Sequence, residues 1–176
     1  MNGSSIFHIL SQNLLIKHVV SYTTFITHLK LNFVAKVSIY LNFQGNTEEA
    51  FNFYKSVFKT EFVGPVIYMK DIPAQPGMTP LPENERNKVM HVCLPILGGA
   101  QIMATDMLES SGHKLKIGNN VTINLEPDTK AEADRLFNEL SKGGSDIAPM
   151  RDEFWGYWGC CLDRFGIRWM FNCVNK

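Results

Sequence analysis

The chain carries one structural unit twice. Residues 37–41 (VSIYL) return as residues 121–125 (VTINL), and each copy precedes an acid-led stretch with helical spacing. Each half then closes on a glycine followed by a strand-like segment, at residues 99–103 and 166–170. A repeat constrains the fold more than a single motif does, because both copies must form the same unit and pack together. It predicts a pseudo-symmetric domain with a cavity between its halves.

Each copy reads as a strand, a helix and three strands. Residues 37–43 alternate apolar with polar side chains, which is typical of a half-buried strand, and the next stretch has the apolar spacing of a helix. The pattern predicts an α+β fold of two βαβββ modules, with helices near residues 47–58 and 127–141 and strands at residues 37–43, 61–69, 88–97, 100–105, 121–125, 146–151, 156–162 and 167–174.

The domain boundaries follow from the repeat. Residues 1–36 contain no Asp or Glu, so we expect a leader outside the core. The first module is expected at residues 37–107, with a Pro-rich loop at 71–87, and the second at 121–174, after a linker at 108–120. We expect Asn46 or Thr47 to cap the first helix.

Charge and cysteine content exclude several classes of protein. The chain has 17 basic and 17 acidic residues, which argues against a nucleic-acid surface. No apolar run reaches the roughly 18 residues of a membrane helix. The four cysteines form no C-x-x-C pair, which favours free thiols and a cytoplasmic location. Exposed strand edges and an aromatic rim favour a homodimer.

A series of short phrases resembles the PhnB-like branch of the vicinal oxygen chelate superfamily, which includes glyoxalase I, fosfomycin-resistance proteins, extradiol dioxygenases and bleomycin-binding proteins. The phrases are residues 40–46 (YLNFQGN), residues 50–58 (AFNFYKSVF), Met90-His91, Trp155-Gly156, Asp163, Phe165-Gly166 and Trp169. The resemblance implies that the modules form a curled, cleft-containing mixed sheet. PhnB-like sequences often carry a methyltransferase label, but the sequence has no G-x-G-x-x-G loop for such a cofactor.

The resemblance also implies where a metal would be held. Metal-dependent relatives take His, Glu or Gln ligands from the first and last strands of each module. We place the corresponding positions at Ile39, Met103, Ile123 and Met170. A shift of one residue would bring up Tyr40, Asn124 and Trp169 instead. None of the first four side chains is a ligand for a hard divalent cation, and the shifted set is hardly better, so we expect no metal in the usual place and no other cofactor.

Five residues are the candidates for ligand binding: Tyr40, His91, Asp106, Trp155 and Trp158. An imidazole titrates near neutral pH, so His91 is also the candidate general base; the alternative is a hydrogen-bonded, half-buried histidine. Asp106 ends a strand, where it either meets a ligand or stabilises a turn. The two tryptophans offer flat apolar faces with a polar edge, which suits a small organic ligand or a packed interface.

These features predict a protein that binds a small organic molecule in the cleft between the modules, without the usual divalent metal. The alternative is a lyase, isomerase or dioxygenase-like enzyme that uses His91 and an atypical site. An interaction scaffold with a filled cleft is a third interpretation. Neither nucleic acid nor membrane is expected as a partner.

Overall fold

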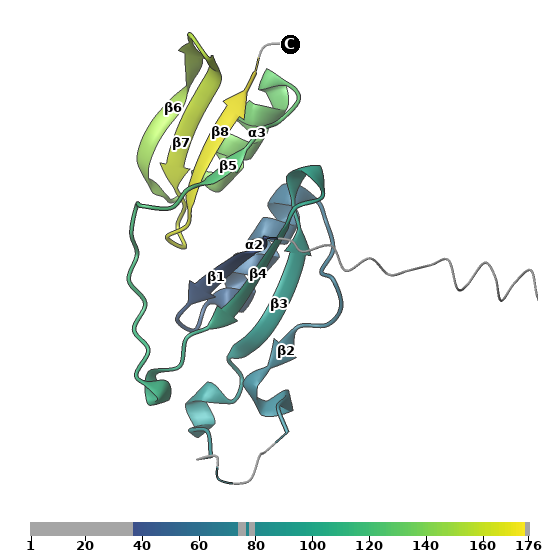
Figure 1. The fold of residues 1–176 in the computed structure, drawn as a ribbon, viewed down its shortest axis with the longest axis vertical. Helices are drawn as coiled ribbons and strands as arrows, with labels where there is room; N and C mark the ends of the chain where they lie inside the picture. Colours follow the sequence, from purple (N-terminus) through teal and green to yellow (C-terminus); the bar gives the residue numbers. More distant parts are fainter. Residues whose placement is uncertain (1–36, 74–76, 78–79, 175–176) are drawn as a thin grey trace, which may run out of the picture. The chain divides into compact units, whose positions relative to one another are not determined.

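The structure is a computed structural model that describes residues 37–73, 77 and 80–174. The predicted leader, residues 1–36, lies outside the described residues. The first module contains β1 (Ile39–Phe43), α2 (Thr47–Phe58), β2 (Ile67–Tyr68), β3 (Val89–Pro95) and β4 (Gln101–Asp106). The second contains β5 (Ile123–Leu125), α3 (Lys130–Leu140), β6 (Ser145–Glu153), β7 (Gly156–Leu162) and β8 (Arg168–Cys173) (Figure 1).

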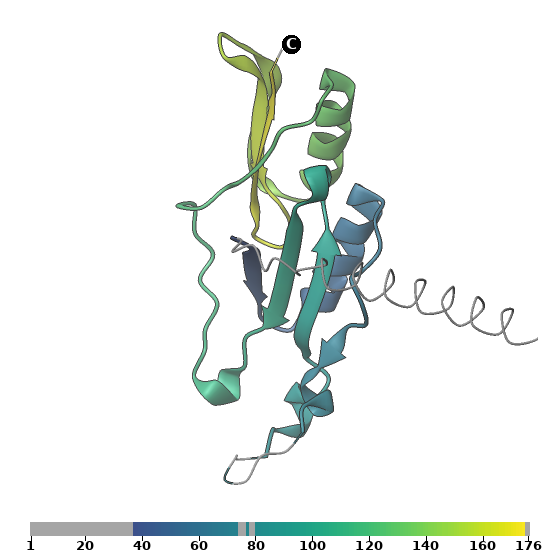
Figure 2. The same cartoon turned by 45° about the vertical axis from the view of Figure 1, so that its right-hand side comes forward.

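The predicted α+β fold of two βαβββ modules is confirmed. Each module forms its own four-stranded sheet, in the order β1-β4-β3-β2 and β5-β8-β7-β6. In both sheets the first strand pairs in parallel with the last strand, and the other pairs are antiparallel. Figure 2 shows both helices on one side of the strands and the linker on the other. We call the side away from the helices the open face of each sheet.

The second strand of the first module, β2, is much shorter than predicted. We expected residues 61–69 to be extended, but only Ile67 and Tyr68 pair with β3, and their register shifts by one residue. Pro65 has no N–H to donate to a ladder, and Gly64 adopts a positive φ of 78°. Beyond Tyr68 the chain turns into a short 3₁₀ helix, in which the Asp71 carboxylate accepts a hydrogen bond from the Tyr68 N–H at 2.8 Å.

Asp106, at the end of β4, caps helix α2 from a distance in the sequence. Its Oδ1 accepts hydrogen bonds from the Gly45 N–H at 2.8 Å and from both the N–H and the hydroxyl of Thr47, at 3.2 and 2.6 Å. Its Oδ2 accepts from the Val89 N–H at 2.8 Å. Asn46 is the N-cap residue, one of the two that the sequence offered, but its side chain makes no capping bond, and the Thr47 hydroxyl donates to Asp106 instead.

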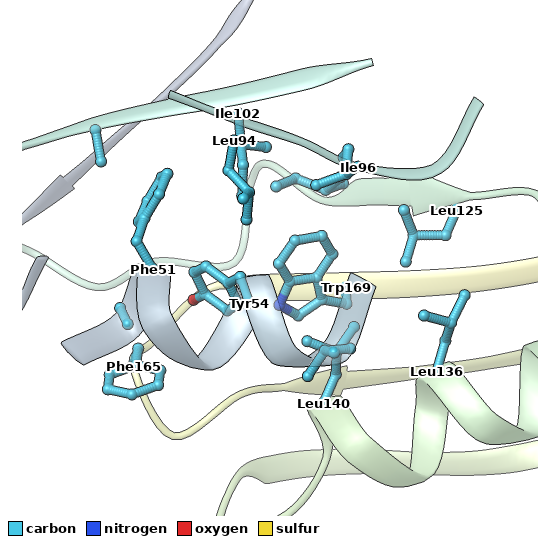
Figure 3. Packing of buried hydrophobic residues seen from close by; sticks show 14 of the residues in the cluster. Phe51, Tyr54, Leu94, Ile96, Ile102, Leu125, Leu136, Leu140, Phe165 and Trp169 are labelled. Atoms are coloured by element: carbon cyan, nitrogen blue, oxygen red, sulfur yellow. The ribbon is translucent and has the colours of Figure 1, made fainter. Parts of the chain in front are cut away.

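One hydrophobic core joins the two modules. Helix α2 buries Ala50, Phe51, Tyr54 and Val57, and the indole of Trp169 on β8 lies against Tyr54, with ring centroids 5.6 Å apart. In Figure 3, Trp169 lies beside Tyr54 of the first module and Leu140 of the second. Within the described parts of the chain, no helix is long and apolar enough to cross a bilayer.

A buried carboxylate, Asp163, fastens the modules together. Only 3% of this residue is exposed. Its Oδ2 accepts hydrogen bonds from the Tyr54 hydroxyl at 2.7 Å and the Trp169 Nε1–H at 2.8 Å. Its Oδ1 accepts from the N–H groups of Phe165 and Ile167, each at 2.9 Å. Burial, followed by the charge of Asp163, raises the pKa of Tyr54 well above its usual value, so the phenol stays protonated and donates.

We predict that Asp163→Asn destabilises the protein by about 2–4 kcal/mol. An asparagine would present one NH₂ group to two donors, and the buried Trp169 N–H would lose its acceptor. Urea unfolding followed by circular dichroism measures the change. Asp152→Asn, on an exposed residue paired with Lys130, is the control and should stay within about 0.5 kcal/mol of the parent chain. Equal stability of the two variants would contradict the prediction.

Candidate functional site

The strand register decides which residues share the open faces. Tyr40 pairs with Met103 across β1 and β4, and Asn124 pairs with Met170 across β5 and β8. Side chains alternate between the faces of a sheet. Ile39 packs against the hydrophobic core and Ile123 is part of it, so both lie on the helix-covered face. Of the four positions that the resemblance implied, Ile39 and Ile123 therefore do not lie on the open faces with Met103 and Met170. In each first strand the one-residue shift, to Tyr40 and to Asn124, gives the residue on the open face.

The corrected set does not fit a divalent metal of the usual kind. It consists of one phenol, one amide and two thioethers, at Tyr40, Asn124, Met103 and Met170. Hard divalent cations prefer carboxylate, carbonyl or water oxygens, zinc and nickel also take imidazole, and thioethers suit softer ions. Among the residues that the structure describes, no group of three or more His, Cys, Asp or Glu side chains is placed to hold a metal ion.

Tyr40 and His91 come together on the open face of the first sheet. The Tyr40 hydroxyl and His91 Nδ1 form a hydrogen bond of 3.2 Å. Because β1 and β3 lie on either side of β4, this hydrogen bond spans β4. Tyr40 is 46% exposed, and the burial of the remainder raises its pKa above the usual value. The ring of Tyr40 is thus held in place and remains accessible to a ligand.

The structure does not bring the other three candidate residues to this pair. The Asp106 carboxylate is buried and occupied by the hydrogen bonds described above. Trp155 lies in the turn between β6 and β7 and contacts Phe154, with ring centroids 4.4 Å apart. Trp158 lies on β7, where the Arg151 guanidinium sits 5.1 Å from its ring. Asp106 therefore has a structural role, and both tryptophans belong to the second module.

The cysteines offer no reactive thiol at this site. All four are free and buried, as the sequence predicted for free thiols. Burial is the first cause that raises the pKa of Cys161, to about 12, and the neighbouring Asp163 charge adds to it. A thiol with so high a pKa is a poor nucleophile at neutral pH.

A cavity of about 520 Å³ lies between the two modules, and we call it the inter-module cavity. Four segments line it: residues 38–42 of β1 and its approach, residues 115–118 of the linker, residues 120, 121 and 123 around the start of β5, and residues 165–168 of the β7–β8 turn. Of the five candidate ligand-binding residues, Tyr40 alone is in its wall; Ile39 and Ile123, two of the positions compared with metal ligands, also line it. The sequence did not single out Lys116 and Arg168, which also line it, since isolated cations carry no local signal.

The other cavities are less suited to a site. One of about 650 Å³ lies beside the Pro-rich loop, next to residues that the structure does not describe. Another of about 280 Å³ lies near the turn between β3 and β4. Neither contains any of the five candidate ligand-binding residues, although Ile39, Ile123 and Asn124 line the smaller one.

Comparison with known proteins identifies structures that share this fold. A fosfomycin-resistance protein, FosX from Mesorhizobium loti, shares the fold at a TM-score of 0.50, with 14% identity over 81% of this chain and 95% of that one. The two modules have the fold found in proteins of the vicinal oxygen chelate superfamily. Residues 35–171 match the family described as 3-demethylubiquinone-9 3-methyltransferase, and the chain belongs to this PhnB-like family.

Two solved structures show the same relationship at higher similarity. Protein PA1353 from Pseudomonas aeruginosa is 32% identical, with a TM-score of 0.68, over 81% of this chain and all of that one. A protein from Bacillus cereus, described as a putative 3-demethylubiquinone-9 3-methyltransferase and PhnB protein, is 24% identical, with a TM-score of 0.58, over 80% of this chain and all of that one.

We predict that the purified, untagged protein contains much less than one equivalent of Zn, Ni or Mn, because the open-face residues do not match the ligand preference of these ions. Inductively coupled plasma mass spectrometry measures the content. The variant Tyr40→His/Met103→His is the positive control, since it sets two imidazoles opposite each other on neighbouring strands and should gain Ni²⁺ binding. One equivalent of metal in the parent protein would overturn the prediction.

Proposed function

We propose that this chain binds a small organic molecule in the inter-module cavity, without a divalent metal in the position used by metal-dependent relatives. The observation that carries the proposal is the cavity itself. Its volume of about 520 Å³ lies within the range of about 300–1,000 Å³ that is usual for small-molecule sites. Tyr40 stands in its wall and is oriented by His91.

The lining of the cavity suits an organic ligand. Its apolar part comes from isoleucine, leucine and valine side chains and Phe165, while Asn42 and Asn120 add amide groups that can donate and accept hydrogen bonds. An apolar surface with a few polar groups is typical of a site that fixes the orientation of a small molecule. Tyr40 supplies a flat ring for contact with an apolar part of the ligand.

We also propose that the protein is located in the cytoplasm and forms a homodimer. Four free, buried cysteines support a reducing compartment. The first strand of each sheet is an edge strand, and an unpaired edge favours pairing with another chain.

Methyl transfer, which the family description names, is not part of the proposal. A methyltransferase of the common type binds its cofactor on a doubly wound parallel sheet with a Gly-rich loop. This chain instead folds into two mixed four-stranded sheets, and its sequence contains no G-x-G-x-x-G.

The proposal predicts that small aromatic fragments bind at the cavity in NMR titrations of ¹⁵N-labelled protein. The amide signals of residues around the cavity, such as Gly118 and Gly166, should shift. Tyr40→Ala should weaken binding about tenfold or more, because it removes the ring in the wall.

Trp155→Ala is the matched control, since it removes an exposed ring outside the cavity and should leave the affinity unchanged. The opposite result, with loss of binding in Trp155→Ala alone, would move the site to the β6–β7 turn. A fragment library that shifts no signals around the cavity would overturn the proposed function.

A second candidate function is supported by the hydrogen bond between Tyr40 and His91. A lyase, isomerase or dioxygenase-like enzyme needs a group that moves protons, and a phenol–imidazole pair on an open face can do so. In this function His91 is the general base, and Tyr40 orients its ring and contacts the substrate.

Turnover of a bound molecule separates the two functions. If the chain is an enzyme, mass spectrometry of the ligand recovered after incubation will show a product. His91→Gln should then lower kcat by about 100-fold or more, with the affinity changed much less. A ligand that is recovered unchanged supports binding alone. Equal turnover by the parent chain and His91→Gln would exclude His91 as the base.

A further inference from the structure

The inter-module cavity has a charge that the whole chain lacks. The chain has equal numbers of basic and acidic residues. The residues that line the cavity include two cations, Lys116 and Arg168, and no Asp or Glu. A concave site with charges of one sign concentrates ligands of the other sign, because the low-dielectric walls focus the field. The local charge therefore favours an anion, although the net charge is zero.

The two cations retain hydrogen-bonding capacity. Most other cationic side chains of the described residues are paired with a neighbouring carboxylate, in the pairs Lys55–Glu61, Arg86–Glu83, Lys88–Glu85, Lys130–Asp152, Arg135–Glu132, Lys142–Glu139 and Arg151–Glu153. Lys116 has no such partner among the described residues. Arg168 has a loose one, Asp146, with 3.7 Å between nitrogen and oxygen, and a contact of 3.6 Å to the Cys160 sulfur. A guanidinium has five N–H donors, so Arg168 can still donate to a ligand.

A packing contact brings the two cations to the same cavity. The linker residue Ile117 lies directly over Gly166 in the β7–β8 turn. A Cβ added to Gly166 would lie 2.7 Å from the Ile117 Cδ1, and the φ of Gly166 is +84°. Glycine allows both the positive φ and the close approach. Lys116 precedes Ile117 and Arg168 follows Gly166 by two residues, so this contact brings both residues to the lining of the same cavity.

The other residues that line the cavity indicate what the uncharged part of the ligand is like. Leu115, Val121 and Ile167 give apolar surface, while the Asn42 and Asn120 side chains can donate to oxygen atoms. We propose that the inter-module cavity selects a small organic anion, with its carboxylate or phosphate group between Lys116 and Arg168 and its apolar body against the linker and Tyr40. This inference rests on the proposed function and adds the chemical class of the ligand.

Matched probes of different charge test the proposal. Benzoate and benzamide have nearly the same shape, and phenyl phosphate offers the other anionic group. Each is titrated into ¹⁵N-labelled full-length protein, and the dissociation constant is taken from the amide shifts of Gly118 and Gly166. We expect benzoate or phenyl phosphate to bind at least about tenfold more tightly than benzamide, as one charge-assisted hydrogen bond allows. The tighter of the two anions identifies the preferred group.

Two variants test the assigned cations, each checked for an unchanged circular dichroism spectrum. Lys116→Met and Arg168→Met should each weaken binding of the anion about tenfold and leave benzamide unaffected. Lys114→Met is the control, because it removes the same charge from the same linker outside the cavity lining. The anion affinity of this control should stay within about twofold of the parent value.

The outcomes separate this inference from the proposed function. Equal binding of benzoate, phenyl phosphate and benzamide at the cavity would overturn the anion preference and leave small-molecule binding in place. An equal loss of anion affinity in Lys114→Met and Lys116→Met would also overturn it, because the effect would then be that of general charge. If none of the three probes and no neutral fragment shifts the cavity signals, both proposals fail.

Discussion

The arrangement of the two modules depends on one buried carboxylate. Asp163 accepts four hydrogen bonds, and the donors come from helix α2 of the first module, from its own turn and from strand β8. A buried charge is costly unless all its acceptor positions are satisfied. Each donor is therefore required, and helix α2 cannot slide along β8 without leaving part of the charge unpaired. The same hydrogen bonds hold one wall of the inter-module cavity in place, because the β7–β8 turn that follows Asp163 forms part of that wall.

The family phrases in the sequence now have a structural explanation. Phe53-Tyr54, Asp163, Phe165-Gly166 and Trp169 are the residues that build the hydrogen bonds and aromatic contacts around Asp163. They specify how the modules join, and Phe165 and Gly166 also line the inter-module cavity. The open faces and the cavity hold the residues that can differ in function. Membership of the family thus determines the scaffold, while the ligand must be argued from the site.

The sequence predicted the elements better than it predicted their register. Period-two and helical spacing located both helices and most strands, because burial on one face leaves a strong local signal. The register has no such signal: a shift of one residue exchanges the faces of a strand, and Tyr40 suits either face because its ring is apolar and its hydroxyl polar. The same limit explains helix α2, where a local cap at Asn46 was expected but Asp106, distant in sequence, accepts the bonds. Lys116 and Arg168, 52 residues apart in the sequence, line one cavity only because of the fold.

The linker contributes to the site differently from the sheets. The strands of both modules must keep an apolar face for the helices, and this restricts half of their side chains. The linker is held at separate points, where Ser110 donates to Glu85, Leu115 donates to Gln44 and Ile117 contacts Gly166, and between the last two it supplies Lys116 to the cavity wall. Connecting segments on a rigid scaffold tolerate substitution more readily than the elements they join. The charge of the cavity can therefore change through the linker while the contacts of Asp163 hold the scaffold constant.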